Sequence, residues 1–288
     1  MNEFVILSDS CHDLPKALAE KLEIGVAPLS VAYDEDTVFD DGTMDPHDFY
    51  EGIRAGKMPK TSAVNLEGWA RLMEPAMKAG RDVLALCISS ALSTTYQSAV
   101  IAGEELMEKY PGRKVLVVDT LSAAVGMGLL VWNAAMMRNE GRDIETVRAW
   151  VEEHKLNVCH WVTVNDLMHL KRGGRVSAAT AVVGTLLQIK PVLIVDDNGK
   201  LETAAKARGR KAAMQMLVDK LVTTGIPGAN DTDTVFLGHG DCPEEAEVMV
   251  QMLKAKGVKN VIVNHVGNVI GSHTGPDVLV IAFLGEKR

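Results

Sequence analysis

The sequence has few cysteines and no apolar run long enough to cross a bilayer. Its four cysteines occur singly, without Cys-x-x-Cys spacing, which argues against a disulfide framework and a zinc ribbon and favours a reducing, cytoplasmic compartment. The longest apolar stretch, residues 123–132, is too short for a transmembrane helix, so we expect a buried helix there. The residues before Asp9 lack the basic start of a secretory signal peptide.

Positive charge is also scarce. The chain has 30 Lys and Arg against 38 Asp and Glu, a net charge of −8, which argues against a general nucleic-acid-binding protein. One window, residues 171–211, runs against this balance with nine basic and three acidic residues. This window is a candidate binding site for a phosphate or for an acidic protein surface, although a basic face that is only exposed to solvent has the same composition.

Several signatures of well-known chemistry are missing. The chain has no G-x-x-x-x-G-K-[ST], no G-x-G-x-x-G after a strand, no G-x-S-x-G and no H-E-x-x-H, so ATP, NAD and metalloprotease functions lose support. The acids Asp34-Glu35-Asp36 and Asp40-Asp41 lack the spacing of a calcium loop and predict a solvated hairpin. We therefore expect no metal and no cofactor.

The first half of the chain alternates apolar strands with helical periodicity, which is typical of βα units feeding a parallel sheet. An insertion at residues 24–45, rich in β-formers and acids, follows the first unit, and residues 56–59 form a Gly/Pro break. The strands are expected at residues 4–7, 83–88 and 114–118. The helices are expected at residues 14–22, 46–54, 66–78, 95–108 and 122–138.

After a helical pattern at residues 143–155, the second half contains more strands and fewer helices. Asp197-Asn198-Gly199 predicts a tight hairpin, because Asn-Gly accepts the positive φ values that such a turn needs. The second sheet is therefore expected to be mixed, in an α/β protein whose domains comprise residues 1–157 and 158–288. Its strands are expected at residues 158–163, 191–195, 200–204, 234–238, 260–264 and 278–284.

Hydroxyl-rich turns follow the predicted strands of the first half. Ser89–Gln97 joins a buried strand to a helix start, where backbone N–H groups and hydroxyls hold phosphates or carboxylates. Ser8-Asp9-Ser10 and Asp119-Thr120-Leu121-Ser122 follow two other strands, and the carboxyl ends of parallel strands meet at one crevice. With Thr61-Ser62, these turns form a candidate anion site; the alternative is that each hydroxyl only caps a helix.

Residues 266–276 predict a Gly-rich loop between two apolar strands, and this loop carries His273. An imidazole there can donate to an oxyanion or act as a base, whereas the simpler interpretation is a loop histidine in solvent. His12, His239 and His265 fit a structural role better.

Taken in order, these segments resemble the DegV family of bacterial fatty-acid-binding proteins along nearly the whole chain. Asp9-Ser10-Cys11-His12-Asp13-Leu14-Pro15 is similar to the family's D-S-x-x-D-L-P, Thr61-Ser62 to the start of T-S-Q-P-S, and residues 89–99 to S-S-x-L-S-G-T-Y-Q-S-A. Leu170–Ser177, Ile189–Leu193 and residues 273–276 are similar to L-x-x-G-G-R-I-S, I-K-P-I-L and H-T-G-P. The chain departs from the family pattern at Ala63-Val64-Asn65, Thr94 and Asp277.

The resemblance implies an N-terminal three-layer α/β/α domain, a C-terminal two-layer α/β domain and one fatty acid held between them. It assigns the fatty-acid carboxylate to hydroxyls and one imidazole, and gives the basic window to an acyl phosphate or a kinase partner. The carboxylate group is Thr61, Ser62, Ser93, Thr94 and His273. The cleft is expected to be lined by Asp9, Ser10, Ser122 and Thr274. The acyl-phosphate or partner group is Arg172, Arg175 and Arg208.

In that system a separate ATP-dependent fatty acid kinase phosphorylates the bound fatty acid, and the carrier supplies acyl phosphate to phospholipid synthesis. The resemblance therefore implies a carrier that is not itself an enzyme, with transient contact to a membrane surface. Two alternatives stay open: a serine hydrolase or acyltransferase with Ser93 as nucleophile and His273 as base, and a small-molecule sensor on the same scaffold. The hydrolase lacks a nucleophile elbow and an assignable carboxylate.

Overall fold

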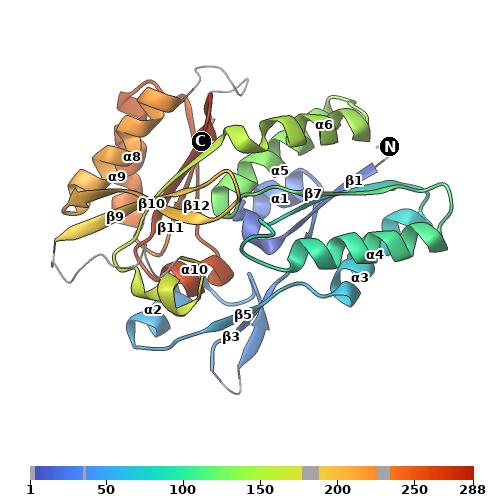
Figure 1. Ribbon diagram of the computed structural model, residues 1–288, viewed down its shortest axis with the longest axis horizontal. Coiled ribbons are helices and arrows are strands. Elements are labelled where there is room, and N and C mark those ends of the chain that lie inside the picture. Colours follow the sequence, from blue (N-terminus) through green and yellow to red (C-terminus); the bar gives the residue numbers. More distant parts are fainter. Residues whose placement is uncertain (1–3, 35–36, 177–187, 226–233) are drawn as a thin grey trace.

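The computed structural model describes residues 4–34, 37–176, 188–225 and 234–288 of this two-domain α/β protein (Figure 1). Its first sheet has four parallel strands in the order β2-β1-β6-β7. Helices α3 and α4 contact one another on one face, and α5 and α6 contact one another and this sheet as well. The strands are β1 (Phe4–Asp9), β2 (Ile24–Ala27), β6 (Asp82–Cys87) and β7 (Val115–Asp119). The helices are α3 (Leu66–Lys78), α4 (Thr95–Lys109), α5 (Ala124–Asn139) and α6 (Ile144–His154).

A small antiparallel sheet, in the order β4-β3-β5, lies in the insertion between β2 and β6. It consists of β3 (Ser30–Ala32), β4 (Val38–Asp40) and β5 (Lys60–Ser62), and α2 (Pro46–Arg54) connects the last two strands. β5 was not expected, because its three residues follow a Gly/Pro break and contain no apolar side chain. The turn after β1 forms the 3₁₀ helix η1 (Ser10–His12), and α1 (Lys16–Lys21) follows it.

The second large sheet has six strands in the order β10-β9-β8-β13-β11-β12. Among the described strands of this sheet, β11 and β12 pair in parallel and the other neighbours are antiparallel, so the predicted mixed sheet is confirmed. Its strands are β8 (Val158–Thr163), β9 (Ile189–Val195), β10 (Leu201–Arg208), β11 (Thr234–His239), β12 (Asn260–His265) and β13 (Leu279–Leu284). Its helices are η2 (Lys155–Asn157), α7 (Met168–Arg172), α8 (Arg210–Thr224), α9 (Pro243–Ala255) and α10 (Asn268–Thr274). No helix of the described segments is long and apolar enough to cross a membrane.

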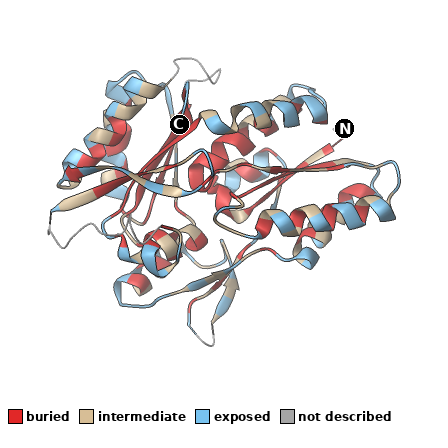
Figure 2. Cartoon of the chain, in the orientation of Figure 1, coloured by how far each residue is buried: buried red, intermediate tan, exposed pale blue. Residues whose placement is uncertain are grey.

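Helix α5 is buried between the two large sheets (Figure 2). Every residue from Ala124 to Trp132 is buried, which confirms the buried helix predicted from the apolar run. The helix approaches its neighbours closely at two glycines. A methyl group at Gly126 would lie 1.9 Å from Nε2 of His160, and one at Gly128 would lie 2.4 Å from the carbonyl oxygen of His12. Both positions therefore require glycine.

Two expectations about loops were wrong. Residues 268–274 form helix α10 instead of a Gly-rich loop, and the hydroxyl of Ser272 donates to the carbonyl of Asn268 at 2.7 Å. Asp41 is not part of a solvated hairpin, because its Oδ1 accepts from the backbone N–H of Asn268 at 3.0 Å. Asp34 and Asp40 are exposed, as predicted, and Glu35 and Asp36 lie outside the described residues.

Candidate functional site

A cavity of about 500 Å³ lies between residues of both halves of the chain. Its volume is within the usual range for small-molecule sites. Apolar side chains make most of the wall, among them Ile88, Val162, Leu170, Leu201, Val266 and Val280. The polar lining includes Thr61, Ser93, Thr94, Arg175, His273 and Thr274. Hydroxyls from early in the chain and an imidazole from late in the chain thus meet at one cavity.

Thr61 and His273 are in direct contact at this cavity. The Thr61 hydroxyl, on β5, lies 2.9 Å from Nε2 of His273, in the last turn of α10. Burial and the nearby charge of Arg175 lower the pKa of His273 to about 4, so the imidazole is neutral at pH 7. Thr61 and the neutral His273 can therefore hydrogen-bond to a ligand without adding an ionic charge to the cavity wall.

Ser93 lies in the turn between β6 and α4, and Thr95 holds it there. The two hydroxyl oxygens are 2.8 Å apart, and the backbone N–H of Val64 donates to Oγ1 of Thr95 at 3.3 Å. Thr95 is fully buried and was not predicted as a site residue, because a threonine at a helix start has the same pattern as a cap. It connects the Ser93 turn to the segment that follows Thr61.

The Gly173-Gly174-Arg175 turn shapes the same part of the cavity. A methyl group at Gly173 would lie 2.2 Å from Nδ1 of His273, so the close approach of the imidazole requires glycine there. Gly174 adopts a φ of +68°, which favours glycine. The chain then turns so that Arg175 lines the cavity, where its Nε donates to the carbonyl of Leu92 at 3.2 Å. A guanidinium is thus placed beside the neutral hydrogen-bonding groups.

Six of the predicted site residues do not line this cavity. Ser62, Arg172 and Arg208 are exposed. Asp9 is buried and accepts from the backbone N–H groups of Cys11 and Ile88 at 3.1 and 2.7 Å. The hydroxyl of Ser10 accepts from Leu29 N at 3.1 Å, and that of Ser122 accepts from Arg288 at 3.0 Å. These last three side chains fix the turns around the site.

His160 is a polar residue in the wall that the sequence did not single out. It lies on β8, with Nδ1 3.2 Å from the carbonyl of Val158, and its ring packs against Gly126. Burial and the charge of Arg288 lower its pKa to about 3, so it is neutral. The alternation of β8 places His160 and Val162 on the same face, towards the cavity, but the sequence does not reveal which face that is.

The β9–β10 hairpin closes another side of the cavity through Val195 and Leu201. Its turn is held by two contacts from outside the sheet. The hydroxyl of Ser89 donates to the carbonyl of Gly199 at 2.9 Å, and Nη1 of Arg288 donates to the carbonyl of Asp196 at 2.7 Å. The hairpin predicted from Asp197-Asn198-Gly199 is therefore present and fixed against the first sheet.

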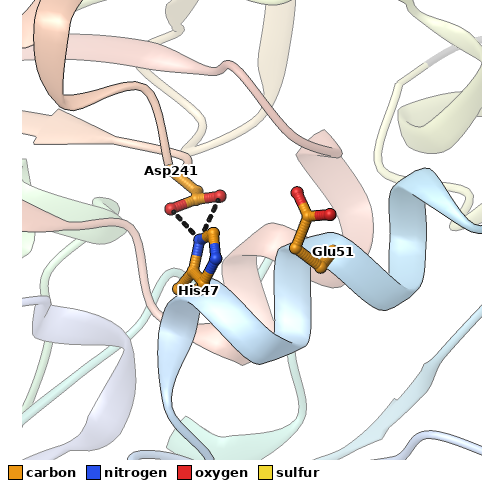
Figure 3. A group of neighbouring side chains, drawn as sticks. All are labelled: His47, Glu51 and Asp241. Carbon is orange, nitrogen blue, oxygen red and sulfur yellow. Dashed lines mark hydrogen bonds and ion pairs between the residues drawn. The ribbon is translucent and has the colours of Figure 1, made fainter.

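A separate group of side chains, His47, Glu51 and Asp241, has the composition of a metal site (Figure 3). Nδ1 of His47 lies 3.1 Å from both carboxylate oxygens of Asp241, which raises the pKa of His47. Arg54 also binds this group, because its guanidinium contacts both Glu51 and Asp241. The acidic charge already has a cationic partner within the protein, so the group is an ion-pair network that joins α2 to the loop after β11.

The comparison with known proteins identifies the family. The DegV family model, described as an uncharacterised protein family, matches residues 3–286. A DegV domain-containing protein from Clostridium perfringens is 44% identical over 100% of this chain and 99% of its own length. The chain belongs to the DegV family. A second DegV domain-containing protein, from Clostridium acetobutylicum, is 32% identical over 98% of both chains.

Solved structures of DegV proteins have the same fold. One from Thermus thermophilus, described as fatty-acid-binding, is 34% identical with a TM-score of 0.85, over 98% of this chain and 99% of its own. Another, a stearic-acid-binding protein from Eubacterium ventriosum, is 25% identical with a TM-score of 0.88, over 98% of both chains. Both the resemblance and the two-domain α/β fold inferred from the sequence are thus confirmed.

The structure shows how two departures from the DegV motifs, Thr94 and Asp277, are accommodated. Thr94 replaces a glycine but has a φ of −80°, which any residue adopts, so the turn before α4 does not require glycine here. Asp277 has a φ of +60°, a conformation that disfavours side chains. Its carboxylate accepts from Arg54 at 2.8 Å and from Asn165 at 2.7 Å, away from the cavity wall. The acid at this position therefore joins the ion-pair network of Arg54.

Proposed function

We propose that this DegV protein binds one long-chain fatty acid in the cavity between its two domains, for which we retain the division into residues 1–157 and 158–288. The carboxylate would lie against Thr61, Ser93, Thr94 and His273, with Arg175 supplying the positive charge. The observation that carries the proposal is the shared cavity: hydroxyls from the first half, the imidazole of His273 and the guanidinium of Arg175 from the second half, and a mostly apolar wall.

The energetics of such a cavity favour a lipid. Each CH₂ group removed from water contributes about 0.8 kcal/mol, so a long chain supplies on the order of 10 kcal/mol before ordering and association costs. Hydrogen bonds to a charged group add roughly 1.5–3 kcal/mol each. The apolar wall therefore supplies most of the affinity, and the polar groups orient the carboxylate. The fatty-acid-binding DegV structures from Thermus thermophilus and Eubacterium ventriosum support this ligand class.

The finer part of the proposal is a carrier role. The protein would present the carboxylate to a separate ATP-dependent kinase, which forms the acyl phosphate, and would deliver that product to phospholipid synthesis at the cytoplasmic membrane surface. Support comes from the exposed arginines Arg172 and Arg208 in the basic window, which face solvent and not the cavity. An acidic kinase surface or a phosphate fits such side chains.

The hydrolase alternative has no support in the side-chain geometry. Nε2 of His273 contacts Thr61, and no hydrogen bond joins it to Ser93 in the described part of the chain. Nδ1 of His273 has no hydrogen-bond partner among the described residues, so no carboxylate orients the ring. A nucleophile–base–acid arrangement needs both contacts.

Native mass spectrometry of protein purified from bacteria tests the ligand class. We expect one added mass of a long-chain fatty acid per chain, and its release on denaturation. Protein that stays free of fatty acid after incubation with several chain lengths would refute the proposal. The kinase step has its own test: a fatty acid kinase with ATP should convert the bound acid to acyl phosphate, and Arg172→Ala with Arg208→Ala should slow that conversion while the fatty acid still binds.

A further inference from the structure

Three carboxylates, the buried Asp9 and Asp13 and the half-buried Asp41, lie near the start of α10, outside the fatty-acid cavity. Asp13 follows η1 and is only 5% exposed. A methyl group at Gly267 would lie 2.7 Å from Oδ1 of Asp13 and 3.5 Å from Oδ2 of Asp41, so both carboxylates face the same point of the backbone. Asp13, Asp41 and Asn268 also line a second cavity, of about 590 Å³.

The three carboxylates differ in the number of hydrogen bonds that they accept. Asp9 accepts from two backbone N–H groups, and Asp41 accepts from those of Asn268 and Val269 at 3.0 and 3.4 Å. Neither oxygen of Asp13 accepts a well-aligned hydrogen bond within the described residues, although the backbone N–H of Gly267 lies near this carboxyl, and Oδ1 of Asn268, a residue only 2% exposed, has no partner there. Buried polar atoms without partners are costly and uncommon, so three such oxygen atoms at one site need an explanation.

Lys16 lines the same second cavity, but no basic side chain of the described residues forms an ion pair with these carboxylates. The ion pairs within the described segments include none to Asp9, Asp13 or Asp41. The exposed group in Figure 3 has Arg54 as its cation. Asp13 and Asp41 have no equivalent, which points to a cation from outside the protein.

We propose that Asp13 and Asp41, together with the amide oxygen of Asn268, bind a hard divalent metal cation of the calcium or magnesium class. Such ions prefer carboxylate and amide oxygens, and two carboxylates balance a charge of +2. Solvent from the adjoining cavity would complete the coordination. The proposal does not depend on which ligand occupies the fatty-acid cavity.

A cation at this position would join three segments that are far apart in the sequence. Asp13 belongs to the turn after β1, Asp41 to the loop after β4, and Asn268 to the first turn of α10. The other end of α10 carries His273. The ion would therefore hold in place the helix that positions the imidazole at the fatty-acid cavity.

Thermal unfolding of the chelator-treated protein, with CaCl₂ or MgCl₂ as the probe and choline chloride at matched ionic strength as the control, tests the site. We expect at least one of the two metal salts to raise Tm by on the order of 5 °C at a hundredfold excess over Kd. Isothermal titration with the same salt should give one site per chain. If neither salt changes Tm or gives heat beyond the choline control, the proposal is wrong and Asp13 is simply protonated.

Two variants test whether the change in Tm on metal addition comes from the proposed site. Asp13→Asn keeps the shape of the side chain and tolerates the φ of +47° at this position, but removes one of the two carboxylates. We expect its Tm without metal to equal or exceed that of the wild type, because a like-charge repulsion is lost, and the response to metal to disappear. Glu51→Gln is the control for the exposed group of Figure 3 and should keep the full response. A response that survives in Asp13→Asn, or is lost in Glu51→Gln, would overturn the assignment.

Discussion

The Thr61 hydroxyl and the His273 imidazole lie 2.9 Å apart, although 212 residues separate them in the chain. This contact joins β5 of the small sheet to α10, and it lies in the wall of the cavity that we assign to the fatty acid. The following predictions concern that cavity and the groups packed around it.

Removal of either hydroxyl should weaken fatty-acid binding without abolishing it. Thr61→Val and Ser93→Ala would each delete a hydrogen bond that we propose to the carboxylate, which corresponds to roughly 1.5–3 kcal/mol or a 10- to 150-fold rise in Kd. Displacement of a fluorescent fatty acid measures the change. Ser62→Ala is the matched control, because Ser62 is exposed and outside the cavity wall. Equal effects of Ser62→Ala and Thr61→Val would contradict this placement.

Substitutions of Arg175 and Arg172 should distinguish the effect of positive charge in the cavity wall from that of positive charge on the surface. Arg175→Gln removes the guanidinium in the cavity wall, so we expect weaker fatty-acid binding and a smaller dependence of Kd on salt. Arg172→Gln changes an exposed side chain and should leave Kd unchanged. Titration of both variants at two ionic strengths decides the point, and a larger loss in Arg172→Gln would reverse the assignment.

A methyl group at Gly173 should disturb the imidazole of His273. Because the new Cβ would lie 2.2 Å from Nδ1, Gly173→Ala forces the ring to move, and we expect weaker fatty-acid binding and a loss of about 1–3 kcal/mol in the free energy of unfolding. Urea unfolding and the fluorescent displacement assay measure the two effects. Lys171→Ala, at an exposed position of α7, should change neither. Unchanged binding in Gly173→Ala would show that the ring position is unimportant.

Acid should weaken the fold through His160. Its pKa is about 3 in the folded state and about 6.5 when unfolded, so below pH 6.5 the unfolded chain binds a proton that the folded chain does not. Stability from this residue is therefore present above pH 6.5 and falls by up to about 1.4 kcal/mol per pH unit towards pH 3.

The buried acids act in the opposite direction, because the folded-state pKa of Asp9 is raised to about 7. A difference measurement cancels their contribution. The gap in unfolding free energy between the wild type and His160→Leu should shift by about 2–3 kcal/mol in favour of the variant from pH 7 to pH 4.5, and stay constant between pH 7 and pH 8. A gap independent of pH would mean that His160 takes up its proton equally well in the folded and the unfolded state.

Loosening the β9–β10 hairpin should speed the release of the fatty acid. Arg288→Ala removes the hydrogen bonds to Asp196 and Ser122, so the hairpin that carries Val195 and Leu201 loses one of its two outside contacts. We expect a faster dissociation rate with little change in the association rate, measured by stopped-flow exchange. Lys287→Ala is the neighbouring exposed control. Identical dissociation rates in both variants would exclude this role for Arg288.

The sequence predicts most of the strands and helices in both halves. Their apolar residues recur with the period of a strand or a helix and so mark the side that is buried. The sequence also predicts that the hydroxyl turns of the first half share a crevice, since they follow parallel strands, whereas only the resemblance to the DegV family places His273 with Ser93. It does not predict β5 or α10, whose short segments are fixed by tertiary contacts such as that between Asp41 and Asn268. It also cannot tell Thr61, in the wall, from the exposed Ser62, because neighbouring residues of a strand point to opposite faces.

The distance along the sequence between Thr61 and His273 also determines how early during protein synthesis the site can form. Because loop closure over 212 residues must precede their contact, the first half of a nascent chain can form its parallel sheet long before the carboxylate pocket is complete. A ribosome-bound chain that ends before α10 has the hydroxyls and most of the apolar wall, but it lacks the imidazole of His273. If the cavity holds a fatty acid as we propose, its capture is therefore a late event, after nearly all of the chain has left the ribosome.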